Sequence, residues 1–189
     1  MLKVEKINSG LVSKLQQSEV TKEMKSIEKS DWVVIEEENN KIMGAVGVGG
    51  IFHVSSISVS KERRGSGLGK KLQNYLINEA KRLHFSFLIV FVDPRNLAST
   101  KLHNSLGYQT IFRIHYSSEI IQDVKILVLR KRGNIIKKML KSFNSFYGMI
   151  FLALFLKIFK IFLRGIIGYG EEIIPEPSIS EIIKKFEKI

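Results

Sequence analysis

The chain has 189 residues, a formal net charge of +12 at pH 7, a hydrophobic content of 44% and no cysteine. This composition excludes wholesale disorder and a polytopic membrane protein, and the missing cysteine excludes disulfides, thiolate metal sites and a cysteine nucleophile. The length suits one domain with an appendage, and the first residues show no secretory signal, so we expect a cytoplasmic protein.

The hydrophobic pattern predicts an α/β domain. Taken in chain order, the expected strands span 2–7, 32–36, 42–48, 52–59, 86–92, 108–115 and 123–129. One or two short helices are expected within 9–30. A longer helix follows from Leu68, with apolar residues at every fourth position, and a short one runs from Asn96 to Gly107. This order predicts one mixed sheet with helices on both sides.

The positive charge is concentrated near the C-terminus. From residue 124 to residue 170 there is no Asp or Glu, whereas ten basic residues occur there: Lys125, Arg130, Lys131, Arg132, Lys137, Lys138, Lys141, Lys157, Lys160 and Arg164. The composition changes near Gly133. We therefore predict a balanced domain over 1–132 and a basic, aromatic-rich helical extension over 133–189.

A glycine-rich segment, Gly65-Ser66-Gly67-Leu68-Gly69, joins an expected strand to an expected helix. Glycine permits positive φ and lets a phosphate approach the backbone, whose N–H groups bind anions at a helix start. Lys70 and Lys71 add positive charge. The segment lacks the G-K-[ST] ending of a Walker A loop and the spacing of a dinucleotide-binding G-x-G-x-x-G.

Two signatures carry a family resemblance. The residues from Arg64 to Gly69 match R-x-x-G-x-G, and Ile57-Ser58-Val59-Ser60 resembles the strand that precedes this motif. Downstream, the pattern N-x-x-[AS]-x-x-L-[Y]-x-x-x-G-[FY] is matched by Asn96, Ser99, Leu102, Gly107 and Tyr108. Over about residues 1–131 the chain thus resembles the GNAT superfamily of N-acetyltransferases. The resemblance implies a mixed, mostly antiparallel sheet flanked by helices, here with a C-terminal helical extension.

The resemblance implies acetyl-CoA, or another acyl-CoA, as cofactor and direct attack of a primary amine on its thioester. Backbone amides of the glycine-rich segment would hold the pyrophosphate. Main-chain groups of the strand over 52–59 would pair with the pantetheine in a gap beside the strand over 87–92. The implied cofactor-binding residues are Ile57, Ser58, Val59, Arg64, Gly65, Ser66, Gly67, Leu68, Gly69, Lys70, Asn96 and Ser99.

The resemblance also places three catalytic candidates. The N–H of Val59 would hold the thioester oxygen as charge develops on it. His103 stands where many relatives have the Tyr that protonates the leaving thiolate, and an imidazole with a pKa of about 6.5 has the chemistry for that role. His53 falls where relatives carry a basic carboxylate. For both histidines a purely structural role is the alternative, and no residue spacing suggests a metal.

The extension has four interpretations. Its apolar helical face and clustered cations are typical of an interfacial helix on an anionic membrane surface, here over 135–167. The alternatives are packing on the domain itself, a homodimer interface, or a membrane span over 143–167. Nucleic acid is disfavoured because so many Leu, Ile and Phe residues accompany the charge.

The sequence therefore predicts an acetyl-CoA-dependent N-acetyltransferase that modifies an amine acceptor, with association at the inner face of a membrane as the leading hypothesis. One alternative is a soluble small-amine or protein acetyltransferase that dimerises through the extension. Another is a non-catalytic sensor that binds acyl-CoA.

Overall fold

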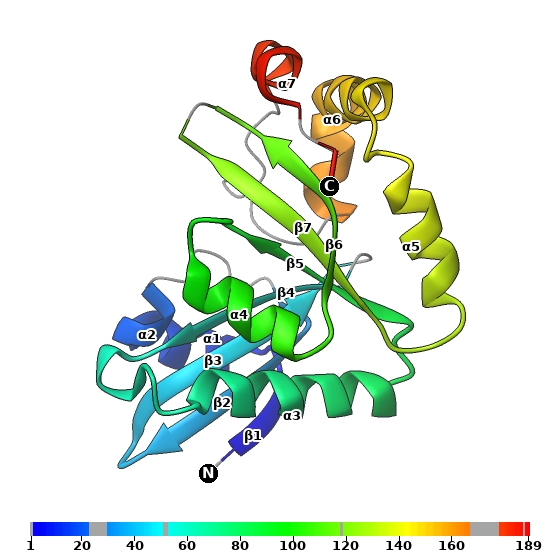
Figure 1. Cartoon of the computed structure of the whole chain (residues 1–189). Coiled ribbons are helices and arrows are strands. Elements are labelled where there is room, and N and C mark those ends of the chain that lie inside the picture. The colour runs from blue at the N-terminus through cyan, green and yellow to red at the C-terminus, as the bar shows by residue number, and fades with distance from the viewer. Residues whose placement is uncertain (1, 23–29, 51–52, 118, 167–177, 187) are drawn as a thin grey trace. The chain divides into compact units, whose positions relative to one another are not determined.

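In the computed structural model of the chain, the described residues are 2–22, 30–50, 53–117, 119–166, 178–186 and 188–189 (Figure 1). They form two compact units, the first ending at Phe85 and the second starting at Ser86. Each unit is described by itself.

The first unit contains four antiparallel strands in the order β1-β2-β3-β4. Its elements are β1 (Leu2–Lys6), α1 (Ser9–Gln17), α2 (Glu19–Lys22), β2 (Trp32–Glu38), β3 (Lys41–Gly49), β4 (Val54–Val59), the 3-10 turn η2 (Lys61–Arg63) and α3 (Leu68–Arg82). Leu11 and Leu15 of α1 pack on Val33, Ile35 and Ala45. Since neighbouring residues of a strand point to opposite faces, this core lies on one face of the sheet, and α3 contacts the other.

Gly44 lets α3 lie close against β3. A Cβ atom built at Gly44 would stand 2.7 Å from Cδ1 of Leu72 and 3.3 Å from Cδ2 of Leu68, and both leucines are buried. Gly44 pairs with Glu36 on one side and with Val59 on the other. The absence of a side chain at Gly44 therefore seats the first turns of α3 beside the end of β4.

The end of β2 carries three consecutive glutamates whose ion pairs reach four different elements. Glu36 accepts a hydrogen bond from Lys71 of α3 at 3.0 Å, and Glu38 pairs with Arg63 of η2. Glu37 accepts from Lys14 at 2.6 Å and from Lys3 at 3.1 Å, and these bonds lower the pKa of its carboxyl group. The pairs made by Glu36 and Glu38 attach α3 and η2 to the sheet.

The second unit contains three antiparallel strands in the order β5-β7-β6. Its elements are β5 (Phe87–Val92), α4 (Leu97–Ser105), β6 (Gln109–His115), β7 (Ile121–Val128), α5 (Gly133–Lys141), α6 (Phe146–Ile166) and α7 (Ile179–Lys185). Helix α5 contacts β6 and β7, and α7 contacts β6 and α6.

The last helices are tied closely to this unit. A Cβ atom at Gly133 would lie 2.2 Å from the carbonyl oxygen of Ser86, so α5 can begin there only because Gly133 has no side chain. Asn144 bonds both the backbone N–H, at 3.1 Å, and the backbone oxygen of Ile189. None of the helices within the described residues is long and apolar enough to cross a membrane.

The expected α/β fold with mostly antiparallel strands and flanking helices is confirmed. Strand β4 begins at Val54, later than predicted, and residue 52 lies outside the described part. His53 stands in a turn with φ of 46°. The domain boundary between 132 and 133 stays a prediction.

The contact at Gly44 can be tested by overpacking. We expect Gly44→Val to lower the free energy of unfolding by about 1–3 kcal/mol, because Leu68 and Leu72 would have to move. Urea denaturation measures this cost. In a Leu72→Ala background the valine should cost much less, since the alanine leaves room for it. Equal costs in the two backgrounds would contradict the contact.

Candidate functional site

The turn between η2 and α3, residues 64–67, has the backbone geometry that an anion site requires. Gly65 and Gly67 have φ of 80° and 82°, and no atom of the described residues lies within 4 Å of a Cβ built at either position. Helix α3 starts without a side-chain cap within the described structure, and its first intrahelical bond runs from the N–H of Lys71 to the oxygen of Gly67 at 3.0 Å. The preceding amides of α3 can therefore serve a phosphate group.

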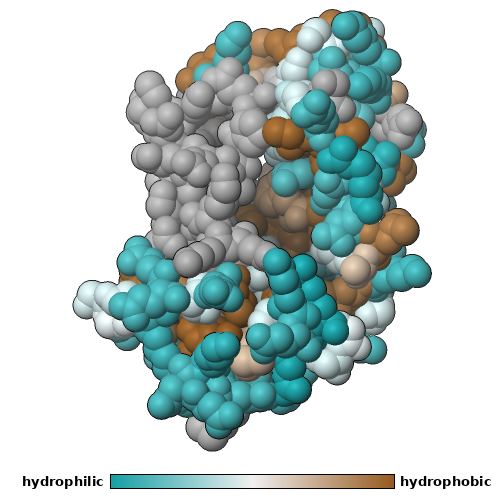
Figure 2. All heavy atoms as spheres, turned by 90° about the vertical axis from the view of Figure 1, so that its left-hand side faces the viewer, coloured by the Kyte–Doolittle hydropathy of each residue, from teal (hydrophilic) through white to brown (hydrophobic). Residues whose placement is uncertain are grey.

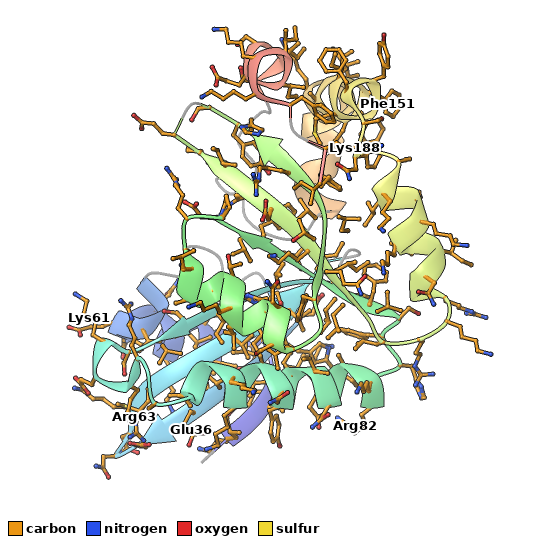
Figure 3. The ribbon with its side chains drawn as sticks, in the orientation of Figure 1. Glu36, Lys61, Arg63, Arg82, Phe151 and Lys188 are labelled. Atoms are coloured by element: carbon orange, nitrogen blue, oxygen red, sulfur yellow. The ribbon has the colours of Figure 1, made fainter. Side chains whose placement is uncertain are left out.

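The surroundings of this glycine turn are cationic and anchored. Arg64 and Lys70 are exposed, and Nε of Arg64 donates to the backbone oxygen of Val59 at 3.2 Å. Oγ of Ser66 donates to the oxygen of Arg63 at 2.7 Å. Figure 3 labels Arg63, which pairs with Glu38, and Glu36, which pairs with Lys71. These two pairs fix the turn and α3 to β2. These residues fit the pyrophosphate expected from the sequence.

A pocket of about 830 Å³ opens beside the glycine turn within the first unit. We call it the side pocket. Its lining comes from α1, α2, the β2–β3 hairpin, β4 and η2, and comprises Lys14, Gln17, Ser18, Glu19, Val20, Asn40, Lys41, Ile42, Met43, Val59, Ser60, Lys61, Glu62 and Arg64. Figure 2 looks onto this side of the first unit and shows hydrophobic atoms ringed by hydrophilic ones.

The side pocket is more basic than acidic. Lys14, Lys41, Lys61 and Arg64 line it against two carboxylates, those of Glu19 and Glu62. Lys14 is bound by Glu37, which does not line the pocket. The excess of cations favours a ligand that carries a carboxylate or a phosphate.

His53 lies at the opposite end of β4 from Val59. Val59 follows His53 by six positions, and six positions of extended chain span about 20 Å. The imidazole of His53 stacks on Phe85 with a centroid separation of 4.1 Å, and burial lowers its pKa, against an opposing effect of Asp31. The structure thus surrounds His53 with packing contacts, and its role as base stays a prediction.

In the second unit, α4 brings together three of the predicted residues. Oδ1 of Asn96 caps the helix by accepting from the N–H of Ser99 at 3.0 Å. Nδ1 of His103 lies 2.8 Å from the carbonyl oxygen of Ser99 and 3.3 Å from its Oγ. A carbonyl can only accept, so Nδ1 carries the proton and Nε2 is the remaining acceptor of the neutral ring.

The surroundings of His103 favour its neutral form. The ring is 2% exposed and packs edge-on against Tyr108, and burial is the main cause that lowers its pKa. The charge of Lys125 lowers it further, whereas the bond to Ser99 raises it. Lys125 is itself buried, with Nζ 2.7 Å from Oγ1 of Thr110 and 3.2 Å from Oδ1 of Asn104.

The predicted site residues thus form two clusters, one in each unit. The first holds the residues from Ile57 to Lys70, and the second holds Asn96, Ser99 and His103. The sequence did not indicate the side pocket, because its lining is assembled from separated elements. Nor did the sequence indicate that Lys125 is buried. The alternation of β7 tells only which residues share a face of the sheet with it.

Comparison with known proteins gives one family. The model of the acetyltransferase (GNAT) family matches residues 6–108. The chain is similar to L-methionine sulfoximine/L-methionine sulfone acetyltransferase of Salmonella typhimurium and to L-amino acid N-acyltransferase of Escherichia coli. Each is 33% identical over 84 residues, which cover 40% of this chain and 49% of the relative. The chain therefore spans about half the length of the curated relatives it matches.

The fold is similar to that of a phosphinothricin acetyltransferase from Sinorhizobium meliloti, solved in complex with acetyl-CoA. The TM-score is 0.54 and the identity 16%, with 69% of this chain and 89% of the other covered. At that identity the likeness shows the fold alone.

The buried histidines predict how stability depends on pH. The pKa of His103 and that of His53 lie below the ordinary value of 6.5 in the folded chain. Below about pH 6.5 the unfolded chain therefore binds more protons, and the free energy of unfolding falls as the pH is lowered. His103→Asn keeps a donor for the oxygen of Ser99 but cannot titrate, so its free energy of unfolding should fall less between pH 7 and pH 5.

Urea denaturation at a series of pH values measures this effect. His53 has a positive φ, which asparagine tolerates. His53→Asn should therefore also reduce the fall of the free energy of unfolding between pH 7 and pH 5. A pH dependence that neither substitution changes would contradict the assignment.

Proposed function

Because the chain belongs to the acetyltransferase (GNAT) family, we propose that it transfers an acetyl group from acetyl-CoA to a primary amine. The observation that carries this proposal is the glycine turn, with two left-handed glycines, open space above them and the uncapped start of α3. The side pocket begins at the same residues, Val59 and Arg64, and offers room for the acceptor.

The family resemblance assigns cofactor contacts to residues of each cluster. In the first unit, the amides from Arg64 to Lys70 would bind the pyrophosphate, and Arg64 and Lys70 would add charge. The half-buried backbone of Ile57 and Val59 would align the pantetheine, on either side of the buried Ser58. In the second unit, Asn96 and Ser99, at the start of α4, would contact the pantetheine or a phosphate.

When bound, acetyl-CoA supplies a thioester whose carbonyl carbon the amine attacks directly. The N–H of Val59 would stabilise the charge that develops on the carbonyl oxygen. The carbonyl of Val59, in the next peptide unit, accepts from Nε of Arg64, and this bond links the glycine turn to the end of β4.

His103 is our candidate for delivering a proton to the leaving thiolate, through Nε2. Its buried ring is neutral near pH 7, so this role requires the ring to bind a proton before it can give one. Its bond to Ser99 favours the charged form and works against the effect of burial.

The acceptor that the side pocket fits best is an amine that also carries a carboxylate, such as an α-amino acid. Lys41 and Lys61 line the pocket near the glycine turn and can bind the carboxylate. The two curated relatives are named for acting on amino acids or their analogues, which supports this class of substrate.

Release of coenzyme A from acetyl-CoA, measured with a thiol reagent, tests the function. We expect turnover with L-methionine sulfone and other L-amino acids, and weaker turnover with alkylamines of similar length. Lys41→Ala and Lys61→Ala should raise KM for the amino acid while leaving KM for the alkylamine unchanged, and Lys6→Ala, on β1, is the matched control. Binding of coenzyme A without thiol release for any amine would replace this proposal with the sensor hypothesis.

The glycine turn makes a separate prediction. Gly67→Ala places a side chain at φ of 82°, a strain of about 1–2 kcal/mol that the turn can relieve only by changing shape. We expect the Kd for coenzyme A, measured by calorimetry, to rise by about ten-fold or more. Gly10→Ala, in α1, is the matched control and should leave Kd unchanged. An unchanged Kd in Gly67→Ala would exclude the turn as the phosphate site.

A further inference from the structure

Among the described side chains of α6, one apolar face is packed and another is exposed. Met149 and Ala153 are 2% and 1% exposed, and the helix contacts α7. Five large side chains remain open to solvent, which we call the apolar stripe: Tyr147, Phe151, Leu154, Phe155 and Ile158. Since an α-helix turns about 100° per residue, the stripe and the packed residues lie on roughly opposite faces.

The stripe is much more exposed than a packed apolar face would be. Tyr147, Phe151 and Ile158 are 83%, 61% and 69% exposed, and Phe151 and Phe155 stack on each other with a centroid separation of 6.2 Å. Figure 3 labels Phe151 on α6. Such a contiguous apolar surface marks an interaction site, because single soluble chains rarely expose one.

Helix α5 of the same unit repeats the pattern on a smaller scale. Ile135 and Met139, one turn apart, are exposed, as are Lys138 and Lys141 between and beyond them. The whole stretch from residue 124 to residue 170 carries ten basic residues and no acidic one. A partner that covers the apolar stripe therefore meets an excess of basic residues in this part of the chain, of which Lys138, Lys141 and Lys157 are exposed.

The charge decides between the candidate partners. A second copy of the chain would bring two acid-free basic stretches together, and like charges across an interface oppose association. An anionic phospholipid surface instead complements the charge, accepts aromatic and aliphatic side chains at its headgroup boundary, and lets lysines reach the phosphates.

We propose that the apolar stripe of α6, with the basic residues around it, binds the surface of an anionic membrane. Phe151 and Ile158 insert among the acyl chains near the headgroups. Exposed cations such as Lys138, Lys141 and Lys157 bind lipid phosphates. This proposal does not depend on acetyl transfer, and its test uses no cofactor.

Flotation of the full chain with lipid vesicles tests the proposal. We expect binding to vesicles that contain phosphatidylglycerol, weak binding to pure phosphatidylcholine, and a decrease with added salt. The double variant Phe151→Ser/Ile158→Ser should lower the partition coefficient by about ten-fold or more, because it removes apolar surface from the bilayer. The matched control Leu97→Ser/Ile120→Ser replaces two other exposed apolar side chains, outside the stripe, and should bind like the parent chain.

Three results would overturn the proposal. The first is an absence of flotation with anionic vesicles, and the second is undiminished flotation of the stripe variant. The third is a dimer of the parent chain in sedimentation equilibrium that the stripe variant converts to monomer, since this assigns the stripe to a second copy. Circular dichroism and urea denaturation of the variants establish that they fold like the parent.

Discussion

The close contact between β3 and α3 is the constraint on which the candidate site depends. Gly44 sits in one row of the sheet between Glu36 and Val59, and the leucines of α3 occupy the space that a side chain there would fill. The helix start is thereby held beside the end of β4, so the short connection must turn back sharply. Two left-handed glycines make that turn. The same geometry that closes the connection also leaves backbone N–H groups facing outward.

Electrostatics divides the molecule into regions with different tasks. The three glutamates at the end of β2 neutralise cations from β1, α1, η2 and α3, and thus hold elements together. Arg64 and Lys70 remain exposed on the glycine turn. The stretch that contains α5 and α6 carries ten basic residues and no acidic one, and we assign this charge to a membrane surface, whereas in α7 Lys185 pairs with Glu181. Net charge alone does not distinguish these uses, because the same residue type serves in all three.

The sequence predicted the strands, the long helix α3 and the glycine turn, because each has a local signal: alternation, four-residue spacing and positive-φ glycines. The start of the short helix at Asn96 also has a local cause, because the side chain of Asn96 caps α4. In contrast, nothing near His53 in the sequence indicates that its ring stacks on Phe85, and nothing near His103 indicates a buried lysine. These environments arise from residues more than twenty positions away. The side pocket escaped prediction for the same reason.

The C-terminal helices cannot be treated as a detachable anchor. Gly133 abuts the backbone of Ser86, α7 lies against β6, and Asn144 holds the main chain of Ile189. Cutting the chain at residue 132 would therefore uncover strand surface that is normally covered, and a loss of activity in such a fragment would report misfolding as readily as detachment. Swapping these helices onto a related domain would need matching changes in β6 and at Ser86, so this part of the chain is constrained to evolve together with the sheet beneath it.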